Sequence, residues 1–274
     1  MGGTAYTFGC TGAGDLALWK SDGTSSGSSF VASVGLCEST WVRATAVLGG
    51  KLYFLAADEL WSSDGTAVGT TWIAGADRGD DLVVLGSTLY FSNDGRLYKS
   101  DGTRAGTVEV ANPGSPAGLV SAGGKLFFDE MTYGGLWVSD GTSAGTKRVT
   151  SAPTAVNAIT AVGSRVFFTG SQDGVSEDLW TSDGTKVGTH RVKDIDPTRA
   201  DHVKNLVAVG STLYFQARDA SHGYELWKSN GTARGTVMVK DIRAGSRGSG
   251  PADLINVGGT LFFTANDGKH GLRL

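Results

Sequence analysis

The chain has 274 residues, with 42 glycines, 5 prolines and 19% charged residues, a composition that excludes a collagen-like chain and argues against a disordered one. The formal net charge is -3, and acidic and basic residues are mixed along the whole sequence. No basic stripe could follow a phosphate backbone, so we expect no nucleic-acid partner.

The N-terminal segment reads MGGTAYTF, which has neither a basic n-region nor an apolar h-region. No apolar run in the sequence approaches the length of a membrane span. From these two observations we expect a soluble chain with no signal peptide and no membrane span.

The two cysteines, Cys10 and Cys37, both lie near the N-terminus. A disulfide between them is conceivable, and so are two free thiols in a reduced protein. The sequence does not supply the distance that a disulfide requires, so both states stay open at this point.

A seven-residue motif recurs along the chain and is the main signal in the sequence. It reads LWKSDGT in its first copy and LWKSNGT in its last, and its aromatic residue recurs every 37 to 47 residues, at Trp19, Trp61, Tyr98, Trp137, Trp180 and Trp227. A period of this length is typical of repeat architectures. The Asp-Gly and Asn-Gly pairs predict two-residue hairpin turns, because these residues adopt positive φ at low cost.

Each copy predicts four short strands, which we name a, b, c and d in chain order. In the copy at 205–242 they are NLVAV, TLYFQA, ELWKS and TVMVKDI, separated by turns and polar loops. The strands are rich in Val, Leu and aromatic residues, and no segment has a helical period. We expect the leucine and the aromatic residue of strand c to fill the space between neighbouring sheets.

These observations predict an all-β chain, a β-propeller of four-stranded antiparallel blades. We expect one domain over 1–274, with repeat units at about 1–36, 37–76, 77–112, 113–150, 151–196, 197–242 and a partial unit at 243–274. The first unit starts at strand b and the last stops within strand c, so the ends are incomplete. Seven blades are expected; the alternative is six, with 259–274 as a surplus hairpin.

The repeat resembles the bacterial ELWxSDGTxxGTxxVKDI propeller repeat. The copies LWTSDGTKVGTHRVKDI at 179–195 and ELWKSNGTARGTVMVKDI at 225–242 carry this resemblance. It covers essentially the whole chain. It implies a propeller and a secreted or cell-surface protein, whereas it implies no activity, because the shared residues are turn and core positions.

The candidate ligand-binding residues are those that interrupt the repeat, near the start of the predicted strands a. Mixed polar groups in such positions could orient a ligand, although solvated rim residues would look the same. Trp41 could stack on a sugar ring, and Trp72 also stands outside the repeat pattern. The candidate set is Arg43, Asp80, Asp81, Asn157, Lys204, Asn205 and Trp41.

Metal and catalytic groups give weaker signals. The pairs Asp80-Asp81 and Asp194/Asp196 offer the oxygens that Ca²⁺ prefers but fit no EF-hand loop, so we expect no cofactor, with Ca²⁺ as an alternative. The four histidines lie in different repeat contexts without the spacing of a zinc site. His202, beside Asp201, could serve acid–base chemistry, but no nucleophile motif accompanies it.

Three functions remain open. The first is a non-enzymatic, lectin-like binding module that recognises a glycan or a protein surface through loops at one face. The second is a structural unit, or a propeller fragment, that self-associates through its incomplete terminal blades. The third is a hydrolase- or lyase-like enzyme with an asymmetric site, which would require perturbed ionisable groups clustered on one face.

Overall fold

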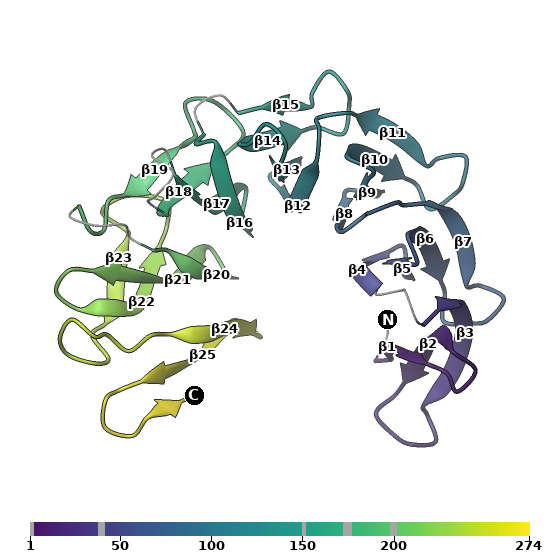
Figure 1. The fold of residues 1–274 in the computed structure, drawn as a ribbon, viewed down its shortest axis with the longest axis horizontal. Helices are drawn as coiled ribbons and strands as arrows, with labels where there is room; N and C mark the ends of the chain where they lie inside the picture. The colour runs from purple at the N-terminus through teal and green to yellow at the C-terminus, as the bar shows by residue number, and fades with distance from the viewer. Residues whose placement is uncertain (1–2, 38–41, 150–151, 172–176, 198–201) are drawn as a thin grey trace. The chain divides into compact units, whose positions relative to one another are not determined.

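The computed structural model describes residues 3–37, 42–149, 152–171, 177–197 and 202–274, and these form seven antiparallel sheets (Figure 1). The first sheet contains β1 (Ala5–Cys10), β2 (Asp15–Ser21) and β3 (Ser29–Leu36). The second contains β4 (Val42–Leu48), β5 (Lys51–Ala56), β6 (Glu59–Ser63) and β7 (Thr71–Gly75). The third contains β8 (Leu82–Leu85), β9 (Thr88–Asn93), β10 (Arg96–Ser100) and β11 (Val108–Ala111).

The remaining four sheets follow the same order. They contain β12 (Pro116–Ala122), β13 (Lys125–Glu130), β14 (Leu136–Ser139) and β15 (Lys147–Arg148); then β16 (Ala155–Val162), β17 (Arg165–Ser171), β18 (Asp178–Ser182) and β19 (His190–Lys193). Next come β20 (Lys204–Val209), β21 (Thr212–Asp219), β22 (Gly223–Ser229) and β23 (Val237–Lys240), and finally β24 (Ala252–Val257), β25 (Thr260–Asn266) and β26 (Leu272–Arg273). No helix in the described ranges is long and apolar enough to cross a membrane.

The predicted sheet count and the predicted incomplete ends are confirmed. The first sheet has only strands b, c and d of the repeat, and the last sheet has only strands a, b and c. Strand β24 pairs with β25 inside the last sheet. The residues after 258 therefore belong to a seventh sheet and not to a surplus hairpin.

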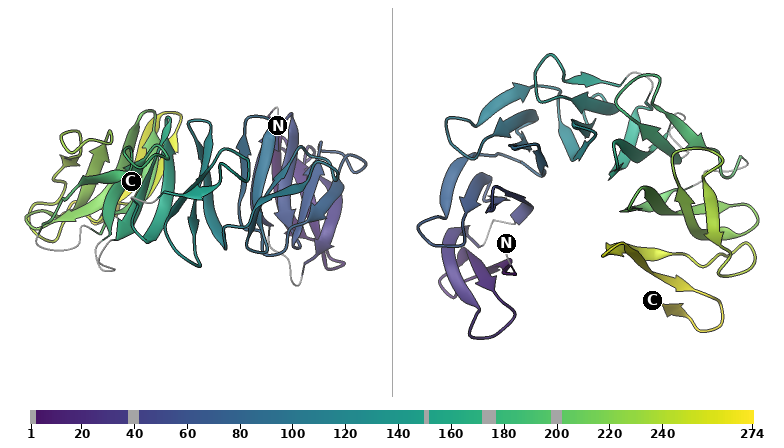
Figure 2. Two further views of the ribbon diagram at one scale, coloured as in Figure 1. Left: turned by 90° about the horizontal axis from the view of Figure 1, so that it is seen from above. Right: turned by 180° about the vertical axis from the view of Figure 1, so that it is seen from behind.

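The chain divides into two compact units. Unit 1 comprises Met1–Leu119 with Gly141–Ala144, and unit 2 comprises Val120–Asp140 with Gly145–Leu274. Within each unit, consecutive sheets pack face to face, as the two views of Figure 2 allow the reader to follow.

The packing of unit 2 explains the alternation of large side chains in the repeat. On one face of the β16–β19 sheet, Phe168 and Trp180 pack against the preceding sheet. On the opposite face, Phe167 and Leu179 pack against the following sheet. We call these the backward and the forward face of a sheet, respectively. Because successive side chains of a strand point to opposite faces, the adjacent aromatic residues of strand b serve two different interfaces.

Unit 1 repeats this arrangement. Phe54 of the second sheet joins the cluster shared with the first sheet, whereas Tyr53 and Leu60 join the cluster shared with the third. Leucine and aromatic residues of strand c therefore do fill the space between sheets, as predicted. In these clusters the leucines face forward and the aromatic residues face backward.

The SDGT segments do not form the predicted two-residue hairpin turns: the connection between β10 and β11 spans residues 101–107, and hydrogen bonds within the segment close it. In one copy, Asp101 Oδ1 accepts from the backbone N–H of Thr103 at 2.9 Å and from its hydroxyl at 2.7 Å. The hydroxyl of Thr103 accepts from the backbone N–H of Gly106 at 3.0 Å. A Cβ on Gly106 would collide with the carboxylate of Asp101, which explains the second glycine of the motif. The hydrogen bonds to Thr103 also lower the pKa of Asp101.

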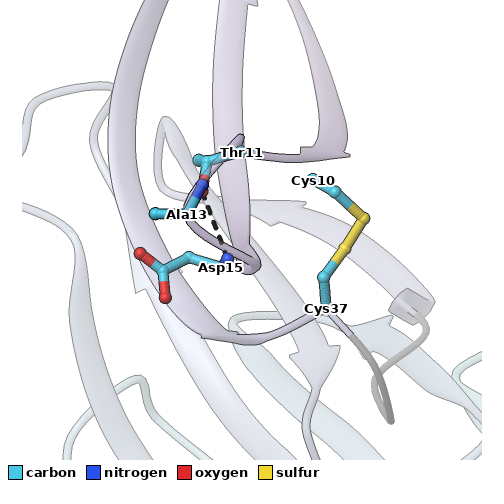
Figure 3. The surroundings of a disulfide bond; sticks show 5 residues. All are labelled: Cys10, Thr11, Ala13, Asp15 and Cys37. Carbon is cyan, nitrogen blue, oxygen red and sulfur yellow. Dashed lines mark hydrogen bonds between the residues drawn. A yellow bond between two sulfur atoms is a disulfide. The ribbon is translucent and has the colours of Figure 1, made fainter.

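A disulfide joins Cys10 at the end of β1 to Cys37 just beyond β3 (Figure 3). Their Cα atoms are 5.6 Å apart, within the range that disulfides require. Between them, the hydroxyl of Thr11 accepts hydrogen bonds from the backbone N–H groups of Ala13 and Asp15, at 3.3 and 3.1 Å. The structure thus resolves the question that the sequence left open.

Candidate functional site

The strands of each sheet begin and end at two chemically different ends of the sheet, which we call the turn edge and the variable edge. The turn edge carries the Gly-rich turns between strands a and b and the SDGT turns between strands c and d. The variable edge carries the b–c connections and the starts of strands a, because neighbouring strands run antiparallel. The SDGT turns are built alike in most copies, whereas the b–c connections differ in sequence and length. Residues that interrupt the repeat therefore collect at the variable edge.

Arg43 and Asp80 of the predicted contact set meet at the variable edge of unit 1. The guanidinium of Arg43 lies 3.3 Å from a carboxylate oxygen of Asp80 and 3.3 Å from one of Asp58. The side chains are exposed, 72% in the case of Asp80. Exposed ion pairs of this kind contribute little to stability, so these charges remain accessible to a partner.

Asp81 differs from its neighbour Asp80 because it is partly buried. The backbone N–H groups of Leu119 and Gly118 donate hydrogen bonds to its carboxylate, and burial, outweighing these hydrogen bonds, raises its pKa. Asp81 therefore ties the start of β8 to the start of β12. This contact gives it a structural role within unit 1.

Asn157, Lys204 and Asn205 lie at the variable edge of unit 2, and all three are exposed. Asn205 has φ of 56°, and its side-chain amide donates to the carbonyl of Pro251 at 3.4 Å. The equivalent residues Gly118, Ala158 and Asp253 also have positive φ, so strand a contains a recurrent backbone kink. Asn, Asp and Gly adopt this conformation most readily, which accounts for much of the residue choice at this position.

Of the two tryptophans outside the repeat pattern, only Trp72 lies in the part of the chain that the structure describes. Trp41 lies outside the described residues. Trp72 lies on β7, as expected for an outer strand, and the guanidinium of Arg104 sits 4.7 Å from its ring centroid. This cation–π contact occupies one face of the Trp72 ring.

The second carboxylate pair suggested as calcium ligands contacts arginines. Asp194 accepts from Arg191 at 3.2 Å, and the buried Asp196 lies 4.0 Å from Arg218. Within the described ranges, no group of three or more His, Cys, Asp or Glu side chains is positioned to hold a metal ion.

The histidines correct one expectation from the sequence. His222 and His270 share one context, because each ends an Asp-x-x-His connection between strands b and c. In these loops Asp219 and Asp267 accept from the histidine backbone and ring, with ring contacts of 2.8 and 2.6 Å. The hydrogen bond to Asp219 raises the pKa of His222. Asp201, the suggested neighbour of His202, lies outside the described residues.

The b–c connection of the fourth sheet presents an exposed apolar pair that the repeat pattern does not predict. The buried carboxylate of Glu130 accepts from the backbone N–H groups of Thr132 at 2.7 Å and Tyr133 at 2.6 Å. This closed turn leaves Met131 70% and Tyr133 73% exposed. One signal was available in the sequence: two successive glycines, Gly134 and Gly135, stand four and five residues after Glu130. Both glycines have positive φ in the structure.

The side chain of Asp129, next to this turn, is expected to make the stability of the folded chain depend on pH. Burial raises its pKa to about 6, so the folded chain binds more protons than the unfolded chain between pH 4 and 6, and stability falls as the pH rises through this range. A shift of this size would correspond to at most about 3 kcal/mol, and solvent screening of a partly exposed group reduces the expected effect to about 1 kcal/mol.

We therefore expect Asp129→Asn to be more stable than the wild type at pH 7 and to lose this advantage at pH 4. Urea unfolding midpoints at the two pH values measure the difference. An equal effect of the substitution at both pH values would contradict the assignment to Asp129.

Comparisons with known proteins concern the fold. No protein-family model matches the sequence, and no curated protein is similar to it. The chain is similar to the crystal structure of the computationally designed Ika8 protein, with a TM-score of 0.59 and 13% identity, over 97% of this chain and 79% of that one. The chain has a β-propeller fold.

Two further solved structures are similar at a lower level. The AfRom2 CNH domain has a TM-score of 0.53 and 9% identity, over 86% of this chain and 84% of that one. The Pyrococcus horikoshii acylaminoacyl peptidase has a TM-score of 0.53 and 10% identity, over 96% of this chain and 47% of that one. At these identities the likeness concerns the propeller fold alone.

Proposed function

We propose that this propeller is a non-enzymatic binding module that recognises a protein surface through the variable edge. The observation that supports this best is the exposed pair Met131 and Tyr133 on a turn fixed by the buried Glu130. Aromatic residues and methionine are enriched at protein interfaces, and a turn that is already ordered avoids much of the entropy cost of binding.

The neighbouring residues fit the same role. Asn157 and Lys204, at the variable edge of the next two sheets of unit 2, add exposed polar groups. Polar groups around an apolar contact are typical of an interface rim. The turn edge, by contrast, uses its Asp and Thr side chains in its own hydrogen bonds.

The test is a selection of phage-displayed random peptides on the immobilised chain. We expect enriched peptides to bind at least ten-fold more weakly to Tyr133→Ser, a change of about 1.4 kcal/mol. Val187→Ser is the matched control, because Val187 is a 92% exposed apolar residue at the turn edge. Peptides equally sensitive to both variants, or no enrichment, would overturn the proposal. Binding to a glycan array with the same Tyr133 dependence would replace the protein partner by a glycan.

We further propose that the protein works in an oxidising compartment, as a secreted or cell-surface protein. The disulfide between Cys10 and Cys37 supports this location, as does the resemblance to the ELWxSDGT repeat. Thiol labelling of protein taken directly from its producing cells should find both cysteines blocked; two reactive thiols would contradict this location.

A further inference from the structure

The forward face of the last sheet is apolar and exposed. Within unit 2, Ile255 and Val257 of β24 are each 55% exposed, Phe262 of β25 is 40% exposed and Leu272 of β26 is 65% exposed. Contiguous apolar surface of this kind marks interaction sites.

The equivalent positions of the fourth and fifth sheets are buried by the next sheet in the chain. Phe262 takes the place of Phe127 and Phe167, which are 0% and 2% exposed. Val257 takes the place of Ala122 and Val162, which are 5% and 7% exposed. In unit 2 these residues belong to the clusters that join consecutive sheets. The last sheet thus carries one half of an interface that the same unit forms repeatedly.

The other half of this interface has a recognisable feature, the first glycine of the SDGT turn. In the interfaces between sheets, an aromatic residue of the preceding sheet lies against this glycine: Tyr6 against Gly65, Tyr53 against Gly102 and Phe167 against Gly231. A Cβ on Gly231 would lie 3.3 Å from the ring of Phe167. The aromatic ring therefore packs directly onto the glycine, where a larger residue would collide with it.

In the first sheet the equivalent glycine, Gly23, is not covered by an aromatic residue. A Cβ on Gly23 would have no atom within 4 Å. On the same backward face, Thr7 pairs with Trp19, as Phe54 pairs with Trp61 in the next sheet. Thr7 is exposed and Phe30, which contacts Trp19, is 48% exposed. The first sheet therefore offers the receiving half of the interface, with smaller side chains than the internal copies have.

We propose that the forward face of the last sheet binds the backward face of the first sheet of a second copy of this chain. Phe262 of one copy then lies against Gly23 of the other, as Phe167 lies against Gly231 within one chain. The two surfaces differ, so the association is head-to-tail, and it can continue to further copies unless it closes into a ring.

Two variants test both the contact and its direction. Phe262→Glu places a charge on the forward face, and Thr7→Glu places one on the backward face. By light scattering over a concentration series, the wild type is expected to form dimers and larger assemblies, whereas each variant alone is monomeric. An equimolar mixture of the two variants is expected to form dimers and nothing larger, because each variant retains one intact face.

Val187→Glu serves as the control for added charge, and circular dichroism checks that each variant is folded. The control is expected to associate as the wild type does. A wild type that is monomeric at every concentration would overturn the proposal, including the case in which the two faces are satisfied inside one chain. Dimers of Thr7→Glu alone would overturn the head-to-tail direction, since they would require contact between two forward faces.

Discussion

Replacing Glu225 by alanine is expected to lower the free energy of unfolding by about 4 kcal/mol, because the substitution leaves several buried donors without an acceptor. The Glu225 carboxylate is fully buried. It accepts from the backbone N–H groups of Ile242, Arg243 and Ser249 at 3.3, 3.2 and 2.9 Å, and from the Ser249 hydroxyl at 2.6 Å. One side chain of β22 therefore holds the connection that leads from β23 to β24.

Glu59→Ala is the matched control for this prediction. Glu59 occupies the same repeat position, directly before Leu and Trp, but it accepts only from the indole nitrogen of Trp61, at 3.2 Å, among the hydrogen bonds of the described residues. Its loss is expected to cost less than about 1 kcal/mol. Urea unfolding of both variants measures the difference, and hydrogen exchange should show the greatest loss of protection at 242–250 in the Glu225 variant. Equal destabilisation by both substitutions would contradict the role given to Glu225.

These two glutamates illustrate what the sequence could and could not predict. The repeat predicts the strands and the positions of the SDGT turns because both depend on local chemistry, on alternating apolar residues and on a glycine that tolerates positive φ. It does not predict the length of these turns, which is set by hydrogen bonds over several residues. Both glutamates precede Leu-Trp, so the motif presents them as equivalent. Their partners differ because the connection from β23 to β24 is longer than the one from β7 to β8 and folds back against β22. No local pattern encodes that packing.

For the candidate site, too, the sequence predicted positions along the chain but not which side chains are buried. The sequence located the starts of the strands a, where Arg43 and Asp80 do meet. It did not separate these exposed charges from Asp81, whose burial depends on backbone groups of β12. It also missed Met131 and Tyr133, because their exposure follows from a turn closed by Glu130. Burial is set by tertiary packing, which a repeat pattern records only for positions that all copies share.

Removing the disulfide by Cys10→Ala and Cys37→Ala is expected to destabilise the first sheet by about 3.5 kcal/mol in the chain-entropy account of a loop closed over this separation. The disulfide spans 27 residues and joins the ends of β1 and β3 on either side of β2. The first sheet lacks the strand a that the internal sheets have. A covalent link is therefore expected to contribute more here than it would in a complete four-stranded sheet.

Hydrogen exchange of the β1–β3 amides measures this local stability. An effect of 3.5 kcal/mol corresponds to a loss of protection of up to about 400-fold. The wild type treated with a reductant should behave as the double variant does, and the double variant itself should be insensitive to the reductant. Unchanged exchange in both cases would mean that the packing of Leu18, Val31 and Phe54 alone holds the first sheet against the second. In that case the value predicted here would be wrong.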